Sequence, residues 1–337
     1  MMRALRVGEY IMKIERDLMR FIFILMTFIL SVSISTAESR EVVDSMGRHI
    51  TIPDELKRIV VMSEPAVGIP LMELGVQPVG SYGRADDGTY QLGADFVDTV
   101  LGPGHQKPKG IGLGAQTDLE KLHALKPDII IGIEFDIDKA DQLSTVAPVY
   151  LMKFLDTSNH DFSIEQDLAK LTGRETAFQQ LKDTYNKRVE ETKALIKDDT
   201  SKKTYLAVMV SDKLNVIGAS TGVTQALEDV GYKRYQFGAN NAKDNDAQKL
   251  LLQLNAESFG TVNPDVLVVV NGWGNKDRGA DAARAALDKV VPSWQQYMQP
   301  AKEKRVVFVD AAQVLTPSFA SAEYMLDALN DWAKQAK

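Results

Sequence analysis

Short aliphatic runs alternate with helical patterns along most of the chain, and this alternation constrains the fold more than any other feature. Strands that alternate with helices form a mainly parallel sheet with helices on its faces. The sequence therefore predicts an α/β fold. Eight segments are predicted as strands, four in each half of the chain: residues 58–62, 78–82, 128–132, 149–152, 205–210, 214–218, 266–270 and 305–310.

One long amphipathic helix is predicted between the two halves, at residues 174–196. Apolar residues recur at helical spacing from Phe178 to Val189, as on a helix with one buried face. A helix of this length spans roughly 35 Å, which is enough to connect two domains. We therefore predict two lobes, residues 38–173 and 197–337, each a mainly parallel sheet flanked by helices, joined by this one interdomain helix.

A stretch of the first half recurs in the second half at a constant offset. The residues from Glu120 to Ile131 match those from Glu257 to Val268, with a glutamate on a short helix, a Pro-Asp turn and an aliphatic strand. Any helix–turn–strand unit favours Pro and Asp at the turn, because Pro ends helices and Asp turns the chain. That preference does not require glutamate at the same place, so we interpret the match as a pseudo-repeat.

The first 37 residues have the three parts of a secretory signal peptide. A basic run ends at Arg20, residues 21–34 are mostly apolar, and Ala37 closes a small-residue cleavage site. The apolar run is shorter than the approximately 20 residues that a membrane-spanning helix needs. Whether translation starts at Met1 or Met12 stays open.

Cysteine is absent and the formal net charge is -7. Without cysteine the chain has no disulfide, no thiolate metal site and no cysteine-linked lipid. An acidic chain also lacks the basic face that binds nucleic-acid phosphates. Together with the signal peptide, this predicts a freely soluble protein of the periplasm that is not a lipoprotein and has no nucleic-acid partner.

Two interpretations that would give the protein a chemical site are rejected. Residues 218–222 fit the G-x-S-x-G pattern of hydrolases, in which a histidine follows the nucleophile in the chain, but all four histidines precede Ser220. A metal site between two lobes needs ligands from both, and no histidine follows His160. We therefore predict no catalytic residue, no metal site and no cofactor.

Three stretches carry a family resemblance: RIVVMSEPAVGIPLMELGVQPVGSY at 58–82, DLEKLHALKPDIIIG at 118–132 and LNAESFGTVNPDVLVVV at 254–270. They resemble the class III periplasmic substrate-binding proteins of ABC importers, with the iron–siderophore branch nearest. The resemblance implies a monomer that is not an enzyme. It would capture a ferric siderophore and deliver it to an inner-membrane ABC permease and its ATPase. Heme or cobalamin binding by the same fold is the alternative.

The resemblance places the ligand contacts in loops at the carboxyl ends of strands, as in other parallel sheets. These loops contain Tyr82, Arg84 and Phe135 in the first half and Trp273 in the second. Arginine supplies fixed charged donors for an anionic chelate, and aromatic rings supply broad contact. The alternatives are a solvated Arg84 paired with a nearby aspartate and a Trp273 that packs between the lobes. Tyr82 would be the heme ligand in the alternative function. The siderophore class, whether hydroxamate, citrate-type or catecholate, stays open.

In this family one surface glutamate from each lobe is thought to contact the permease. The matching positions are Glu120 and Glu257, placed alike by the pseudo-repeat. The alternative is that each glutamate is favoured by the dipole at a helix N-terminus.

Overall fold

The computed structural model describes residue 19 and residues 38–335, apart from residues 114–115, 156–159, 197, 219–220, 237–250 and 273–276. The chain divides into two compact units, Met1–Ser39 and Arg40–Lys337, and the second contains both sheets. Within the described ranges, no helix combines the length and the apolar character that crossing a bilayer requires.

The first sheet has five parallel strands in the order β5-β4-β3-β8-β9. All five residues of β8 are buried, as expected for a parallel strand whose two faces are both covered. Ile129 and Ile131 pack in the core that includes α2 and α5, whereas Ile130 faces α3 and α4. The strands are β3 (Ile59–Val61), β4 (Gly80–Ser81), β5 (Lys109–Gly110), β8 (Ile129–Ile133) and β9 (Val149–Met152).

Short helices and two small hairpins surround the first sheet. The helices are η1 (Glu64–Gly68), α2 (Ile69–Glu73), η2 (Val97–Leu101), α3 (Leu119–Ala124), η3 (Glu134–Lys139), α4 (Ala140–Ser144) and α5 (Ser163–Thr172). The paired strands outside the sheet are β1 (Ser39–Val43) with β2 (His49–Pro53) and β6 (Gly112–Leu113) with β7 (Gln116–Thr117).

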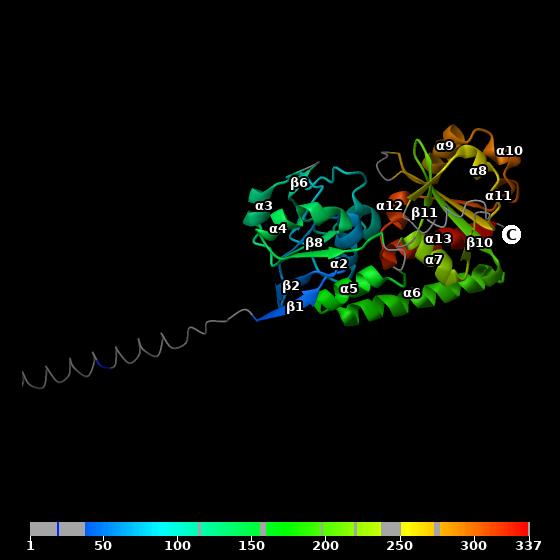
Figure 1. The fold of residues 1–337 in the computed structure, drawn as a ribbon. Helices are drawn as coiled ribbons and strands as arrows, with labels where there is room; N and C mark the ends of the chain where they lie inside the picture. Colours follow the sequence, from blue (N-terminus) through cyan, green and yellow to red (C-terminus); the bar gives the residue numbers. More distant parts are fainter. Residues whose placement is uncertain are drawn as a thin grey trace, which may run out of the picture. The chain divides into compact units, whose positions relative to one another are not determined.

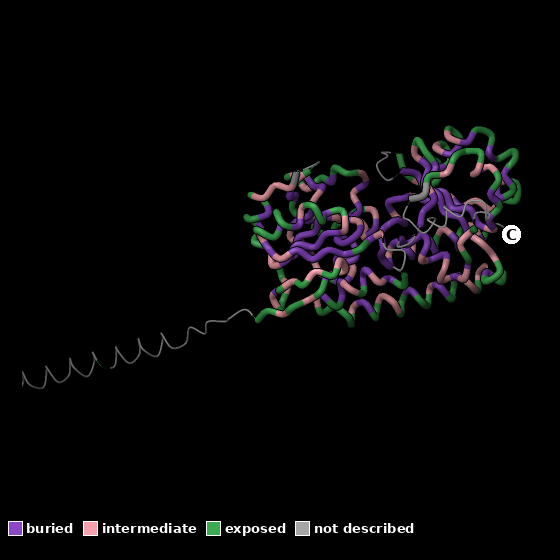
Figure 2. The backbone as a smooth tube through the Cα atoms, viewed as in Figure 1, coloured by how far each residue is buried: buried purple, intermediate pink, exposed green. Residues whose placement is uncertain are grey.

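The second sheet has the order β13-β11-β10-β14-β15, and β12 pairs with the start of β10. Strands β10, β14 and β15 are parallel, whereas β11 runs antiparallel to both β10 and β13. Figure 2 shows the buried strands among more exposed helices. The strands are β10 (Thr204–Val210), β11 (Leu214–Ile217), β12 (Lys233–Arg234), β13 (Leu251–Leu254), β14 (Val266–Asn271) and β15 (Val306–Val309).

Helices cover both faces of the second sheet. On one face, Ala207 and Val268 belong to the core that includes α7 and α13, and on the other Val208 and Val269 pack with α8 and α9. The helices are η4 (Thr200–Lys202), α7 (Gly222–Val230), α8 (Ala256–Gly260), α9 (Ala280–Val290), α10 (Trp294–Tyr297), α11 (Gln299–Lys302), α12 (Ala311–Val314) and α13 (Phe319–Gln335).

A single uninterrupted helix, α6 (Glu175–Ile196), lies between the two halves of the sequence (Figure 1). Its buried side chains include Phe178, Tyr185 and Val189, which belong to the apolar stripe seen in the sequence. It packs against α5, α7 and α13. Phe162 of the segment before α5 stacks on Phe319 of α13, with ring centroids 3.9 Å apart. The predicted fold class, two mainly parallel sheets flanked by helices with one long helix between them, is confirmed.

The structure contains elements that the sequence did not predict. Helix α5 was not predicted, and β11 and β13 add antiparallel pairs to the second sheet. Between the strands predicted at 78–82 and 128–132, where no further strand was predicted, the structure contains β5, β6, β7 and η2. The boundaries of the two lobes at residues 38–173 and 197–337 stay a prediction.

Candidate functional site

The carboxyl ends of β3, β4 and β8 carry several of the predicted ligand residues. These strands are neighbours and parallel, so their carboxyl ends meet at one edge of the sheet, where ligands bind in folds of this kind. Tyr82 directly follows β4, and Phe135 lies in η3, which follows β8.

Phe135 is a solvent-exposed aromatic residue on an anchored backbone at this edge. Its neighbours on both sides are anchored, because the Glu134 carboxylate accepts the N–H groups of Phe154 and Leu155 at 2.8 and 2.6 Å. The Asp136 carboxylate accepts the N–H of Ile133 at 3.1 Å. With its backbone held between these anchors, Phe135 leaves 65% of its surface exposed. Large exposed apolar groups of this kind mark binding surfaces when they cluster.

Two further side chains extend the surface around Phe135, and the sequence analysis did not identify either. Ile137, two residues on in η3, is 41% exposed. Lys139 ends the same helical turn and places its ammonium 5.2 Å from the centroid of the Tyr82 ring. The available signal in the sequence was two apolar residues and a lysine within seven residues after the strand predicted at 128–132.

Tyr82 is half-buried beside Lys139 and Asp136. Burial raises the pKa of its phenol, and the negative charge of Asp136 raises it further. The hydroxyl therefore keeps its proton at neutral pH, so it can donate a hydrogen bond. Coordination of heme iron by tyrosine uses the phenolate, which this environment disfavours.

Arg84 is buried, and all five of its N–H groups are used within the protein. Its Nε and Nη2 donate to Glu64 at 2.6 and 2.7 Å, and Nη1 and Nη2 donate to Asp95 at 3.0 and 2.9 Å. The fifth donor reaches the carbonyl of Gly88 at 2.5 Å. Because the side chain has no exposed surface and a guanidinium has five donors, none remains for a ligand. This differs from the expected ligand contact.

The alternative solvated role for Arg84 does not hold either. Asp86 pairs with Lys121, and Asp87 accepts the N–H of Thr89 at 2.9 Å. The carboxylates that bind Arg84 come from η1 and from residue 95, 20 and 11 residues away in the sequence. The backbone is also tightly packed, since a Cβ on Gly110 would lie 2.1 Å from the Arg84 carbonyl oxygen. Arg84 thus fixes the segment that follows Tyr82.

The two carboxylates of this network have opposite pKa shifts. Burial raises the pKa of Glu64, although Arg84 opposes the shift. Burial also acts on Asp95, but hydrogen bonds from Arg84 and Lys107 outweigh it and lower the pKa of Asp95 to about 2. Asp95 stays charged at any ordinary pH, and the charge of Arg84 is balanced inside the fold.

The predicted contact in the second half, Trp273, lies outside the described residues. The other two tryptophans have structural partners, because Trp294 donates to Asp288 at 2.7 Å and Trp332 donates to the Lys304 carbonyl at 2.9 Å. Ser220 of the rejected hydrolase pattern is also outside the described residues. Thr221 caps α7 instead, accepting the N–H of Thr224.

Glu120 and Glu257 occupy matching positions. Each is exposed and is the second residue of a short helix, α3 or α8, whose N-cap residue, Asp118 or Asn255, accepts a backbone N–H three residues on at 3.0 or 2.7 Å. The Pro-Asp turns match as well.

The aspartates of the two turns anchor equivalent neighbouring strands. Asp128 accepts the N–H of Arg58 at 2.8 Å, just before β3, and Asp265 accepts the N–H of Thr204 at 2.8 Å, at the start of β10. The pseudo-repeat is therefore present in hydrogen bonds as well as in sequence.

In the part of the chain that the structure describes, no group of three or more histidine, aspartate or glutamate side chains could hold a metal ion. The surface at the carboxyl edge of the first sheet consists instead of Tyr82, Phe135, Ile137 and Lys139. These side chains offer aromatic and apolar contact, one phenol and one ammonium.

Residues 86–313 match the family model described as periplasmic binding protein. The chain belongs to this family. The resemblance seen in the sequence is therefore confirmed, and the family consists of substrate-binding proteins of transport systems. Solved structures agree on the fold. Staphylococcus aureus SirA, complexed with staphyloferrin B, superposes with a TM-score of 0.67 at 21% identity, covering 88% of this chain and 98% of SirA.

Two curated relatives are found in Bacillus subtilis. YhfQ, named as a substrate-binding lipoprotein of an ABC transporter, is 26% identical over 293 residues, covering 85% of this periplasmic binding protein and 86% of YhfQ. YfiY, named as a siderophore-binding lipoprotein, is 25% identical over 261 residues, covering 74% of this chain and 77% of YfiY.

These relatives contradict the predicted localisation. The absence of cysteine was taken to indicate a freely soluble periplasmic protein that is not a lipoprotein, but YhfQ and YfiY are both named as lipoproteins. The cysteine content of this chain concerns only one way of attaching a lipid. It does not indicate where the relatives of the chain are located. The prediction of localisation is therefore corrected.

Proposed function

We propose that this periplasmic binding protein captures a ferric siderophore and delivers it to an ABC permease and its ATPase for iron uptake. The proposal rests on membership of the periplasmic binding protein family. It also rests on YfiY, which is named as siderophore-binding and matches 74% of this chain. The chain acts as a monomeric carrier and not as an enzyme. Iron arrives coordinated by the chelator, so the protein supplies contacts and no metal ligand.

The first-half part of the binding surface is formed by Phe135, Tyr82, Ile137 and Lys139. Phe135 and Ile137 supply apolar contact for the body of the chelate, and aromatic rings gain most from such contact when they are held rigidly. The Tyr82 hydroxyl and the Lys139 ammonium supply donors for the outward-facing oxygens. Lys139 thus takes the role expected of Arg84. Trp273 is proposed as the contact from the second half.

Heme binding is less well supported than siderophore binding. The raised pKa of Tyr82 keeps its phenol protonated, so the predicted heme ligand is poorly suited to coordinate iron.

Binding can be tested by titrating the purified protein with a panel of ferric chelates that includes hydroxamate, citrate-type and catecholate siderophores. Tryptophan fluorescence is the readout, and each chelator without iron is the control. We expect saturable quenching by one class. A Trp273→Phe variant should lose most of the quenching, because Trp294 and Trp332 are engaged within the fold. No response to any chelate, with a Soret band after heme addition, would overturn the proposal.

Delivery to the permease would use Glu120 and Glu257. Two exposed glutamates at equivalent places on a pseudo-symmetric protein suit a two-fold symmetric permease, and charge pairing of this kind mainly sets orientation and encounter rate.

A further inference from the structure

Two glutamates direct carboxyl oxygens into the interior where helices α2 and α5 meet the N-terminus of α13: Glu165 is fully buried, whereas Glu73 is half-buried with its Oε2 buried. Glu73 is the last residue of α2, and its Oε1 accepts the N–H of Ala320 at 2.7 Å. Glu165 lies in the first turn of α5 and has no exposed surface. The junction connects elements from both halves of the sequence, with the stacked rings of Phe162 and Phe319 beside it.

The carboxyl oxygens of Glu73 and Glu165 outnumber the hydrogen-bond donors around them. Among the described residues, Glu73 Oε2 and both carboxyl oxygens of Glu165 are buried and have no hydrogen-bond partner. A buried, unpaired carboxylate costs several kcal/mol, and such groups take up a proton instead. A protonated carboxyl group can donate to a neighbouring carboxylate. One proton on the pair would therefore supply the missing donor.

The surroundings favour one negative charge on the pair but not two. The N-terminus of α13 stabilises a single anion, and the Glu73 oxygen that accepts from Ala320 lies there. Burial raises the pKa of Glu73 to about 7, although bonds from Ser318 and Ala320 oppose the shift. Burial and the nearby charge of Glu73 raise the pKa of Glu165 well above its ordinary value, although a weaker interaction with the N–H of Phe319 opposes the shift.

The other charged groups on the surrounding elements mostly have partners of their own. Glu323 and Asp327 on α13 pair with Arg188 of α6. Of these, Glu323 adds a smaller repulsion at Glu73. Further pairs are Asp161 before α5 with Lys182 of α6, Asp167 with Lys170 on α5, Tyr185 of α6 with Asp229 of α7, Asp331 with Lys334 on α13, Glu64 of η1 with Arg84, and Asp98 of η2 with Lys107.

We propose that Glu73 and Glu165 form a proton-binding site, and that one shared proton keeps α2 and α5 closed against the N-terminus of α13. Loss of the proton leaves two buried like charges and loosens this junction. The inference does not depend on the identity of the ligand. It makes the contact between the two halves of the protein sensitive to pH in the neutral and alkaline range.

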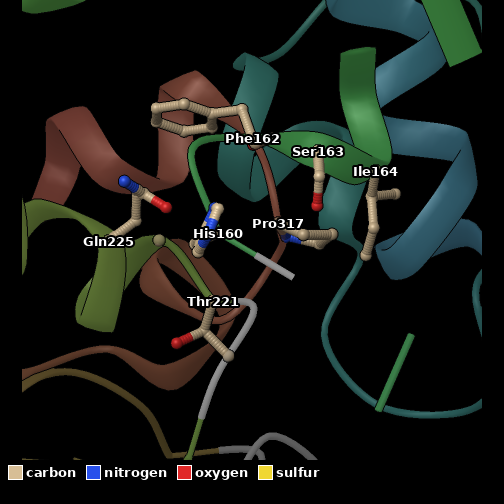
Figure 3. Close-up of a pocket in the computed structure, with 9 residues that line it drawn as sticks. His160, Phe162, Ser163, Ile164, Thr221, Gln225 and Pro317 are labelled. Atoms are coloured by element: carbon tan, nitrogen blue, oxygen red, sulfur yellow. The ribbon is translucent and has the colours of Figure 1, made fainter. Parts of the chain in front are cut away.

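A small pocket lies close to this site. Its volume is about 20 Å³, which is room for about one water molecule, and it lies between α5, α7 and the segment before α13 (Figure 3). Ser163, Ile164 and Pro317 line it, and so does Ser318, whose hydroxyl interacts with Glu73. Exchange of the proton therefore does not require the whole core to open.

The sign of the pH dependence follows from the raised pKa values. The native state keeps a proton that the unfolded chain releases above pH 4.5. The equilibrium constant for folding should therefore fall about tenfold per pH unit for each such proton. The loss should continue upward through about pH 7 and level off above the folded pKa.

Thermal unfolding of the ligand-free protein from pH 5 to pH 9 tests the proposal. The wild type should melt at progressively lower temperature as the pH rises. Glu165→Gln keeps the shape of the side chain without the titration, so it should flatten this slope and melt above the wild type at pH 8. Glu190→Gln is the matched control, because Glu190 is exposed on α6 and pairs with Lys193. It should retain the wild-type slope.

A spectroscopic measurement on the wild type covers the case in which Glu165→Gln fails to fold. Infrared spectra at pH 6.5 should contain the C=O band of a buried protonated carboxyl group. This band should disappear on raising the pH to 9 and be absent from Glu73→Gln or Glu165→Gln where these fold. Parallel melting curves for wild type and Glu165→Gln, or no protonated-carboxyl band in the wild type, would overturn the proposal.

Discussion

Replacing Arg84 with alanine should destabilise the ligand-free protein strongly, because the change leaves carboxylates inside the fold without their partner. Glu64 has no exposed surface and receives two hydrogen bonds from Arg84, and Asp95 receives two more. Removing one partner of a buried ion pair costs about 3–5 kcal/mol. The cavity left by a fully buried side chain adds to the loss, so we expect a value at the upper end of this range.

Urea unfolding measured by far-UV circular dichroism is the suitable assay. Tryptophan fluorescence would report mainly on the second half of the chain, which contains all three tryptophans. Lys107→Ala is the matched control, because Lys107 binds the same Asp95 from the solvent side at 2.8 Å. Such a partly exposed pair contributes only about 0–1 kcal/mol.

A double variant separates the lost charge from the lost packing. Arg84→Met combined with Glu64→Gln removes the uncompensated buried charge while keeping most of the volume, so it should recover part of the stability. If Arg84→Ala unfolds at the wild-type urea concentration but binds the ferric chelate at least about tenfold more weakly, the reasoning is refuted and Arg84 belongs to the ligand surface.

Three further changes test the network, the docking sites and the ligand surface. Asp95 has a lowered pKa, so stability should fall by about 2 kcal/mol as the pH drops from about 4 to 2, and Asp95→Asn should flatten this acid limb of the unfolding curve. Glu120→Lys with Glu257→Lys should abolish iron uptake in cells without changing chelate affinity, and normal uptake would exclude the docking assignment. Phe135→Ala should weaken chelate binding by about 1–3 kcal/mol through lost apolar contact. The melting temperature should not fall, because the ring is exposed. If a fluorescence titration gives the variant the same affinity as the wild type, Phe135 does not contact the chelate.

The strands and several helix ends could be predicted because their signals are local. The aliphatic run predicted at residues 128–132 corresponds to β8, Ile129–Ile133. Helix α7 begins after Thr221, whose side chain accepts the N–H of Thr224, and ends at Gly231, which has a left-handed backbone; threonine before a helix and glycine after it are both common capping residues. In both cases the residues that decide the element lie within it or next to it.

Helix α5 was missed because its start has no capping signal. Phe162 at its N-cap position has a positive φ of 58° and makes no side-chain cap, and Asp161 before it has a φ of 54°. Bulky residues rarely adopt this conformation. Tertiary packing holds it here, since Phe162 stacks against Phe319, and the sequence around residue 162 does not reveal a partner 157 residues away.

The antiparallel pairing of β11 was available in the sequence. Only three residues separate β10 from β11, and so short a connection can join antiparallel strands but not parallel ones, which need a crossover. The prediction of a second half that repeats the first gave too little weight to this spacing.

The site was harder to predict than the fold because burial, not residue type, decides what a charged side chain does. Arg84 stands in a stretch of glycines and aspartates that is typical of an exposed loop. Its partners come from residues 64, 88 and 95, which only the folded chain brings together. For Lys139 the error was the opposite. The sequence analysis did not name it as a ligand contact, although it follows a strand and lies beside Tyr82.

Two clusters of charged side chains, Arg84 with its carboxylates and Glu73 with Glu165, should respond to pH in opposite ways. The balance of hydrogen-bond donors and acceptors in each cluster explains the difference. Around Arg84 every guanidinium donor has an acceptor, so the network is complete when Arg84 and its carboxylates are charged. Acid protonates Glu64, whose pKa is raised, before Asp95, whose pKa is lowered to about 2. Around Glu73 and Glu165 three acceptor oxygens have no donor among the described residues, so that cluster is complete only when it holds a proton. The first network therefore fixes the ligand edge of the sheet across the neutral range, whereas the second makes the junction at α13 depend on pH.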